Sequence, residues 1–121
     1  MEINDAVQSL SALAHTHRLE VFRLLVRYGA DGLAAGEIAE HIGIPNNTLS
    51  SHLSILSRAG LLNADRRGRR IIYSVDFRGI KQVLQFLLED CCQAQPAQSN
   101  RALNLAIGSL SVANSTTGDT P

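Results

Sequence analysis

The sequence lacks any apolar run approaching the roughly 20 residues needed to cross a bilayer, which excludes a membrane-spanning protein. Its first residues, Met1 to Asp5, have neither the basic region nor the apolar stretch of a secretory signal, so we expect a cytoplasmic protein with no membrane partner. There are only two cysteines and no placed base with an orienting group beside them, so no nucleophile system is indicated. We therefore do not expect an enzyme.

The chain also lacks net charge, which at first argues against a nucleic-acid partner. Lysine is nearly absent as well, because ten of the eleven basic residues are arginines. Five arginines lie within thirteen positions, opposed only by Asp65; they are Arg58, Arg66, Arg67, Arg69 and Arg70. The guanidinium fork suits phosphate oxygens and guanine edges, so this distribution predicts one positive surface. A charged hairpin that is merely solvated is the alternative interpretation.

Apolar periodicity predicts mostly helical structure with one β-hairpin, an α+β arrangement in a single domain of 121 residues. We expect helices at 3–14, 16–28, 37–42, 47–58 and 77–91, strands at 61–66 and 70–75, and a loop at 29–36. Gly29 is placed to end the second helix, and Gly68 lies at the tip of the hairpin.

The segment from Gly43 to Asn47 predicts a tight turn between two helices. Gly43 can adopt a left-handed conformation, Pro45 stops the helix before it, and Asn46 or Asn47 can cap the helix after it. A short helix, a tight turn and a longer helix form the helix-turn-helix pattern, and the basic hairpin that follows would be its wing.

The second helix of this motif enters the major groove of double-stranded DNA with its N-terminal end, where asparagine can bond adenine and serine can bond bases or phosphates. Capping and helix solubility explain each of these polar residues equally well when taken singly. The predicted DNA-binding residues are Asn46, Asn47, Thr48, Ser50, Ser51 and His52 on the helix, and Arg66, Arg67, Arg69 and Arg70 on the wing.

The first and last predicted helices carry apolar faces too broad to leave exposed, which favours a homodimer through both. We expect residues 1–92 to form the DNA-binding and dimerisation domain. Residues 93–121 form a C-terminal extension that we expect to be flexible, because its composition turns to Ala, Ser, Asn, Thr and Gln.

Three segments together resemble the ArsR/SmtB family of metalloregulatory repressors: HRLEVFRLL (17–25), SSHLSILSRAGLL (50–62) and RGRRIIY (67–73). The resemblance covers about residues 3 to 92. It implies a homodimer that represses transcription by occupying an operator, and that leaves the operator when an inducer binds.

The two cysteines, Cys91 and Cys92, are adjacent and follow the last predicted helix. The ending FLLEDCC (86–92) is similar to that of arsenic-responsive members, in which a third cysteine follows a few residues later. No third cysteine exists in this chain, so one chain cannot build a site of three thiolates. We expect no permanent cofactor, and an As(III) species as inducer: arsenite, methylarsenite or phenylarsenite, with Sb(III) as a further candidate. An aryl or methyl arsenical needs only two sulfurs, which suits this pair.

Other interpretations of the chain stay open or are weaker. The cysteines could form a strained, labile disulfide and act as a redox switch, or could be inert in a constitutive DNA-binding protein. The family's other arsenic pattern needs thiols near Leu33 to Glu37, where none occurs, and its zinc pattern needs histidine on the last helix, which has none. Capping, packing or DNA contact explains the four histidines more simply than a metal does; they are His15, His17, His41 and His52.

Overall fold

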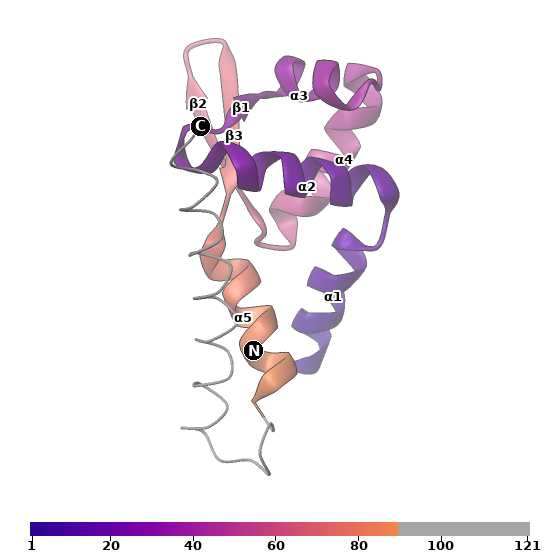
Figure 1. The fold of residues 1–121 in the computed structure, drawn as a ribbon, viewed down its shortest axis with the longest axis vertical. Helices are drawn as coiled ribbons and strands as arrows, with labels where there is room; N and C mark the ends of the chain where they lie inside the picture. The colour runs from indigo at the N-terminus through magenta and orange to yellow at the C-terminus, as the bar shows by residue number, and fades with distance from the viewer. Residues whose placement is uncertain (90–121) are drawn as a thin grey trace. The chain divides into compact units, whose positions relative to one another are not determined.

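The structure, a computed structural model, describes residues 1–89 of the chain (Figure 1). In chain order its elements are α1 (Ile3–Leu13), α2 (Thr16–Tyr28), the 3₁₀ turn η1 (Gly29–Asp31), β1 (Leu33–Ala34), α3 (Ala35–Ile42), α4 (Asn46–Arg58), β2 (Leu62–Arg67), β3 (Arg70–Val75) and α5 (Phe77–Leu88). Helices followed by one hairpin confirm the predicted mostly α, winged helix-turn-helix arrangement. The chain divides into two compact units, Met1–Val83 and Leu84–Pro121, and of the second unit only 84–89 are described.

The core of the first unit forms where α2 passes in front of α4, with α3 above them and the hairpin at one end (Figure 1). Val21 and Leu25 of α2 and Leu49, Leu53 and Leu56 of α4 are almost completely removed from solvent. Their spacing puts them on one face of each helix, so burial of these faces, worth about 1.5–3 kcal/mol for each side chain, fixes α4 against α2. The polar face of α4 is thereby turned outward.

The sheet has three antiparallel strands in the order β1–β3–β2, rather than the two strands predicted. β1 was expected to be loop, but Leu33 pairs with Tyr73 and Ala34 with Ile72. A strand of two residues shows no alternation that could be read from sequence, and its partner lies about forty positions away. β1 joins the base of the hairpin to the start of α3, so the wing and the helix-turn-helix are held together by backbone hydrogen bonds.

The turn between α3 and α4 has the predicted geometry. Gly43 ends α3 in the left-handed conformation, with φ 81° and ψ 36°, and its N–H bonds the Ala39 carbonyl at 2.7 Å. Pro45 is extended and immediately precedes α4. The predicted cap is wrong: Asn46 and Asn47 are the first two residues of α4, the N-cap position is Pro45, and no side chain caps the helix there. Asn47 instead accepts a hydrogen bond from the Thr48 N–H at 2.9 Å, and thus satisfies one amide of the first turn.

The hairpin reverses through Gly68 and Arg69, with Gly68 at φ 66° and Arg67 paired with Arg70. This two-residue loop places the wing arginines close to the tip. Among the helices that the structure describes, none combines the length and the apolar character needed to cross a membrane.

Candidate nucleic-acid interface

Five of the predicted DNA-binding residues share the exposed N-terminal end of α4. Asn46, Asn47, Thr48, Ser50 and Ser51 are all exposed. Buried leucines on the opposite face of α4 hold this end of the helix in place, so these side chains cannot turn inward. The arrangement presents short amide and hydroxyl groups that can approach base edges or phosphates closely. Contact of each residue with DNA stays a prediction.

His52 is the exception, and its placement corrects the prediction that it faces DNA. Its residue is only 8% exposed, and its ring lies 4.6 Å from that of His15 and 5.9 Å from that of His17, both at the start of α2. Arg18 lies within 3.4 Å of its Nδ1. His52 follows Leu49 by three positions, which brings it to the edge of the buried face of α4, where α2 covers it.

Burial, and next the positive charges of His15, Arg18 and His17, lower the pKa of His52 below its ordinary value of 6.5. The neutral imidazole is therefore favoured at neutral pH, and its Nδ1 accepts a hydrogen bond from Arg18. Arg18 also donates from Nε to the Ala12 carbonyl at 2.6 Å. Arg18 thus connects the end of α1 to the middle of α4, and nothing in the sequence had indicated this role.

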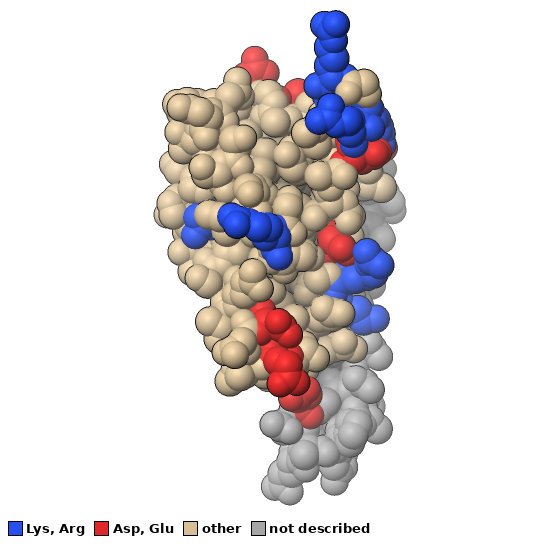
Figure 2. All heavy atoms as spheres, turned by 180° about the vertical axis from the view of Figure 1, so that it is seen from behind, with Lys and Arg blue, Asp and Glu red and all other residues tan. Residues whose placement is uncertain are grey.

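The wing carries Arg66 and Arg67 at the end of β2, Arg69 in the turn and Arg70 at the start of β3, and all four are exposed. Figure 2 shows lysine and arginine atoms gathered at the corner of the molecule where the hairpin projects. Arg67 pairs with Asp65 at 3.0 Å and Arg70 with Glu37 at 3.0 Å, each at exposed positions. Within residues 1–89, Arg66 and Arg69 form no hydrogen bond or ion pair, so their charges are available to an anionic partner.

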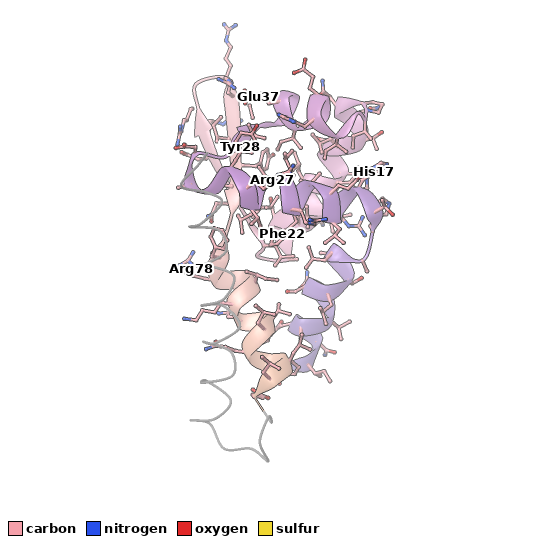
Figure 3. All side chains as sticks on the ribbon, viewed as in Figure 1. His17, Phe22, Arg27, Tyr28, Glu37 and Arg78 are labelled. Atoms are coloured by element: carbon pink, nitrogen blue, oxygen red, sulfur yellow. The ribbon has the colours of Figure 1, made fainter. Side chains whose placement is uncertain are left out.

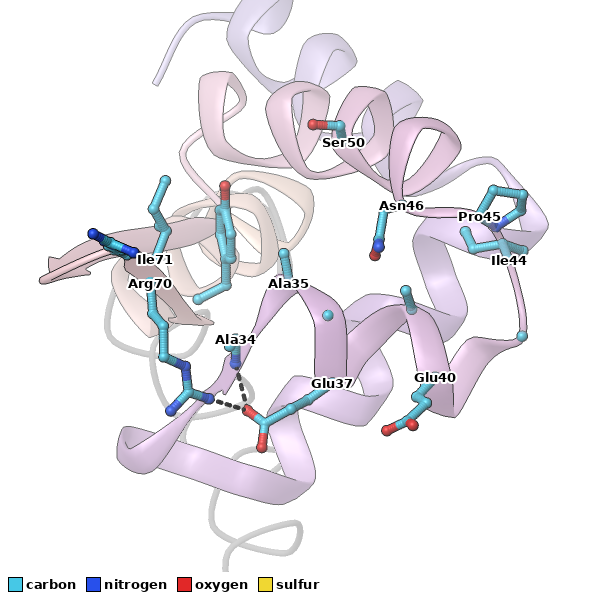
Figure 4. A pocket seen from close by; sticks show the side chains of 15 residues that line it. Ala34, Ala35, Glu37, Glu40, Ile44, Pro45, Asn46, Ser50, Arg70 and Ile71 are labelled. Carbon is cyan, nitrogen blue, oxygen red and sulfur yellow. Dashed lines mark hydrogen bonds and ion pairs between the residues drawn. The ribbon is translucent and has the colours of Figure 1, made fainter.

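Glu37 of α3 lies beside the hairpin (Figure 3) and connects the wing to the helix-turn-helix through the interactions drawn in Figure 4. Its Oε1 accepts from Arg70 at 3.0 Å and from the Ala34 N–H at 2.9 Å. The second bond satisfies one of the free amides at the start of α3. Glu37 was not among the predicted site residues, although its place three residues after Ala34 is the position from which a carboxylate caps a helix.

An open hollow of about 1130 Å³ lies between the wing and the two helices of the motif. Asn46 and Ser50 line it from α4, Glu37 from α3, and Arg69 and Arg70 from the wing (Figure 4). Predicted DNA-binding residues of the helix and of the wing therefore face one common space. The basic groups of this space, Arg69 and Arg70, lie on its wing side.

The predicted dimer surface is visible on α1. Ile3, Val7 and Leu10 are exposed at 66%, 56% and 41% and recur at helical spacing along one face. An apolar stripe of this kind is unfavourable in water and marks an association surface.

The candidate inducer ligands, Cys91 and Cys92, lie outside the described residues. Among residues 1–89, no group of three or more histidine, cysteine, aspartate or glutamate side chains is arranged to hold a metal ion. In particular, His15, His17 and His52 are close but do not form such a site.

Comparison with known proteins agrees with this geometry. Residues 13–63 match a family model described as a helix-turn-helix domain. The transcriptional activator HlyU of Vibrio cholerae is 30% identical over 96 residues, covering 78% of this chain and 86% of HlyU. The transcriptional repressor SdpR of Bacillus subtilis is 32% identical over 77 residues, covering 64% of this chain and 82% of SdpR.

Solved structures extend the likeness to the whole motif. HlyU aligns with a TM-score of 0.58 at 28% identity, covering 77% of this chain and all of HlyU, and a form described as reduced HlyU aligns at 0.56 and 26% identity, covering 74% and 92%. The homodimeric winged helix-turn-helix domain of Mb0332 from Mycobacterium bovis, described as a possible ArsR-family regulator, aligns at 0.59 and 25% identity, covering 77% and 86%. The sequence relatives, the exposed α4 end and the basic wing together place this chain in the ArsR/SmtB-type family of winged helix-turn-helix transcriptional regulators.

Proposed function

We propose that this regulator is a homodimeric repressor that binds an inverted-repeat operator and leaves it when a trivalent arsenical binds Cys91 and Cys92. The observation that carries the DNA-binding half is the exposed N-terminal end of α4, from which Asn46 and Ser50 face the same hollow as the wing. Inserted into the major groove, this end would read base edges, while the wing arginines neutralise adjacent phosphates.

Symmetry sets the form of the operator. Two copies joined through α1 would present two α4 helices related by a two-fold axis, so the operator is an inverted repeat with half-sites about 34 Å apart. With about three phosphate contacts in each subunit, the slope of log affinity on log salt is roughly −5.

The arsenical half of the proposal rests on the chemistry of the two thiols. Thiolates are soft ligands that select soft centres such as trivalent arsenic. In a methyl or phenyl arsenical, trivalent arsenic already has one bond to carbon and needs only two sulfur ligands, which matches the two cysteines of the chain. Arsenite and antimonite need a third ligand, which a small thiol, a water-derived ligand or the partner chain would supply.

Release requires that the inducer and the operator disfavour each other. A ligand at residues 91 and 92, immediately after α5, would stabilise a dimer in which the two α4 helices no longer have the spacing of the half-sites. Coupling between two such sites is typically about 1–3 kcal/mol, and operator binding weakens inducer binding by the same factor.

A second candidate is a repressor in which oxidation of the same pair causes release. Two observations favour it: adjacent cysteines can close only a strained ring, and strained disulfides are the labile ones. The relative HlyU has also been solved in a form described as reduced.

One titration separates these candidates. An operator is first selected from random duplexes with the full chain, and its occupancy is then followed against arsenite, methylarsenite, phenylarsine oxide and hydrogen peroxide. The Cys91→Ser/Cys92→Ser double variant is the control, and it contains no thiol because the chain has no other cysteine. We expect release by arsenicals from the wild type alone.

Each other outcome has a definite meaning. Release by peroxide without release by any arsenical would replace arsenical sensing with redox sensing. Release that survives in the double serine variant would place the inducer site elsewhere. No release by any of the four reagents would refute the sensor.

A further inference from the structure

A second, smaller hollow of about 310 Å³ lies where α1, α2 and α4 meet. Its polar lining consists of Gln8 and Ser11 from α1, Arg18 from the start of α2 and Arg58 from the end of α4. Two guanidinium groups and no carboxylate line it. The hollow is therefore positively charged and has hydrogen-bond donors beside the charge, which suits a phosphate-type anion.

The two arginines are held differently. Arg18 is fixed by its bonds to the Ala12 carbonyl and to His52, which leave its charge uncompensated because neither partner is an anion. Arg58 is exposed and forms no hydrogen bond or ion pair with any residue in the described part of the chain, 1–89. No contact within that part therefore competes with an external anion for Arg58.

Helix geometry places Arg58 on the same side of α4 as the residues predicted to face DNA. Arg58 follows Ser51 by seven positions, so it lies two turns further along that side, about 10 Å away. Ser54 lies between them and is exposed. The exposed polar side of α4 therefore leads directly from its N-terminal end to this hollow.

The length of α4 shows what the hollow would meet on DNA. A helix of 13 residues is about 20 Å long, whereas the major groove of B-DNA is about 12 Å wide. With its N-terminal end at the base edges, a helix of this length would carry its C-terminal end past one edge of the groove, beside the phosphates there. The wing and its hollow lie beside Asn46 at one end of α4, and the smaller hollow lies beside Arg58 at the other.

We propose that Gln8, Ser11, Arg18 and Arg58 form a second phosphate site, which holds a backbone phosphodiester of the operator on the groove edge opposite to the wing. The site deepens the proposed operator binding and is independent of the inducer. It assigns a DNA contact to α1, the same helix that carries the predicted dimer surface. Contact of the DNA backbone with this site would thus depend directly on the spacing of the two protomers.

The test measures the salt dependence of operator binding by the full-length protein with Arg58→Gln. A dimer loses two phosphate contacts, so the slope of log affinity on log salt becomes shallower by about 1.8. Between 50 and 200 mM salt the wild type then loses about 12-fold more affinity than the variant. Because a phosphate contact carries no sequence information, the same change is expected on non-specific duplexes.

Arg27→Gln is the matched control. Arg27 is an exposed arginine in the last turn of another 13-residue helix, α2, so its removal also deletes one positive charge from the last turn of a helix. We expect its slope to equal that of the wild type. Arg58→Lys keeps a positive charge and is expected to retain most of the slope, whereas Gln8→Glu adds a carboxylate to the hollow and is expected to weaken binding.

Several results would overturn the inference. An unchanged slope in Arg58→Gln would show that Arg58 makes no phosphate contact. An equal change of slope in Arg27→Gln would show that the loss of any surface positive charge has the same effect on binding. A titration with inorganic phosphate distinguishes the source of the anion. The Arg58 Nε–H signal is followed by NMR at constant ionic strength. Saturable phosphate binding that DNA does not displace would assign the hollow to a free anion. If the wild type binds no duplex, the proposed function fails together with this inference, whereas a salt effect confined to the wing arginines refutes this inference alone.

Discussion

Gly79, in the first turn of α5, permits a backbone contact that no other residue would allow. A Cβ built on Gly79 would overlap the Gly60 carbonyl oxygen and approach its carbonyl carbon to 2.9 Å. The contact cannot open freely, because the Asp76 N–H bonds the Leu61 carbonyl at 2.9 Å directly beside it. Gly79→Ala must therefore displace the start of α5 from the segment that joins α4 to β2.

The cost can be bracketed from two opposing terms. Forcing an extra carbon into a closed contact costs about 1–3 kcal/mol, and replacing glycine by alanine within a helix returns roughly 0.5–1 kcal/mol. The difference between the two terms is a net loss of about 0–2.5 kcal/mol in the free energy of unfolding, with a central value of about 1.25 kcal/mol. At about 4–8 °C for each kcal/mol in a domain of this size, that central value lowers Tm by roughly 5–10 °C.

Gly36→Ala is the matched control for this substitution. Gly36 also lies in the first turn of a helix, α3, but a Cβ built there meets nothing within 4 Å. Its replacement should raise stability by about 0.5 kcal/mol. Urea unfolding of both variants at one fixed protomer concentration measures the difference, since dimerisation makes stability concentration-dependent. A Gly79→Ala variant as stable as Gly36→Ala would refute the reasoning.

Two further predictions concern electrostatics around α4 and the wing. Because the pKa of His52 is lowered in the folded state, the unfolded chain binds more protons as pH falls below about 6.5. The stability contributed by neutral His52 is complete above that pH and is lost as pH falls toward the folded-state pKa. Between pH 8 and pH 5, the urea midpoint should therefore fall less in His52→Asn than in the wild type. Parallel curves for the two proteins would contradict this. Glu37→Gln should change the free energy of unfolding by less than about 1 kcal/mol, since the ion pair between Glu37 and Arg70 is exposed. The substitution should strengthen DNA binding and steepen the salt dependence of binding, because it frees Arg70. Fluorescence anisotropy with a labelled duplex measures both effects, and weaker binding would mean that Glu37 is needed to position the wing.

The fold was largely predictable because its helices carry strong local signals. The bounds of α2 agree with the prediction at both ends, and those of β3 do as well. α2 combines clear apolar periodicity with Gly29 at its C-terminal end, and β3 combines β-branched composition with Gly68 in the turn that precedes it. Gly43 and Pro45 fixed the turn of the motif for the same reason, since their conformational preferences act locally.

Features that depend on distant partners were not predictable. β1 exists only because Leu33 and Ala34 meet β3, and the closeness of Gly79 to Gly60 follows from packing, not from either local sequence. In the site, the helix pattern placed the polar residues of α4 correctly on its exposed side. It could not show that Arg18, 34 positions earlier, lies against His52, which is buried and not part of the exposed side of α4.

The short side chains on the exposed end of α4 also limit how this regulator can find its target in a genome. Side chains of the asparagine, threonine and serine types offer few two-point contacts with bases, and each base pair read in this way contributes only about 1–3 kcal/mol of discrimination. Millions of competing sites require more than a few such contacts. Much of the specificity for the operator must therefore come from the distance between half-sites and from the ease with which the DNA between them bends. Insertion of a single base pair at the operator centre, which leaves every contacted base intact, should then be more damaging than a substitution within a half-site.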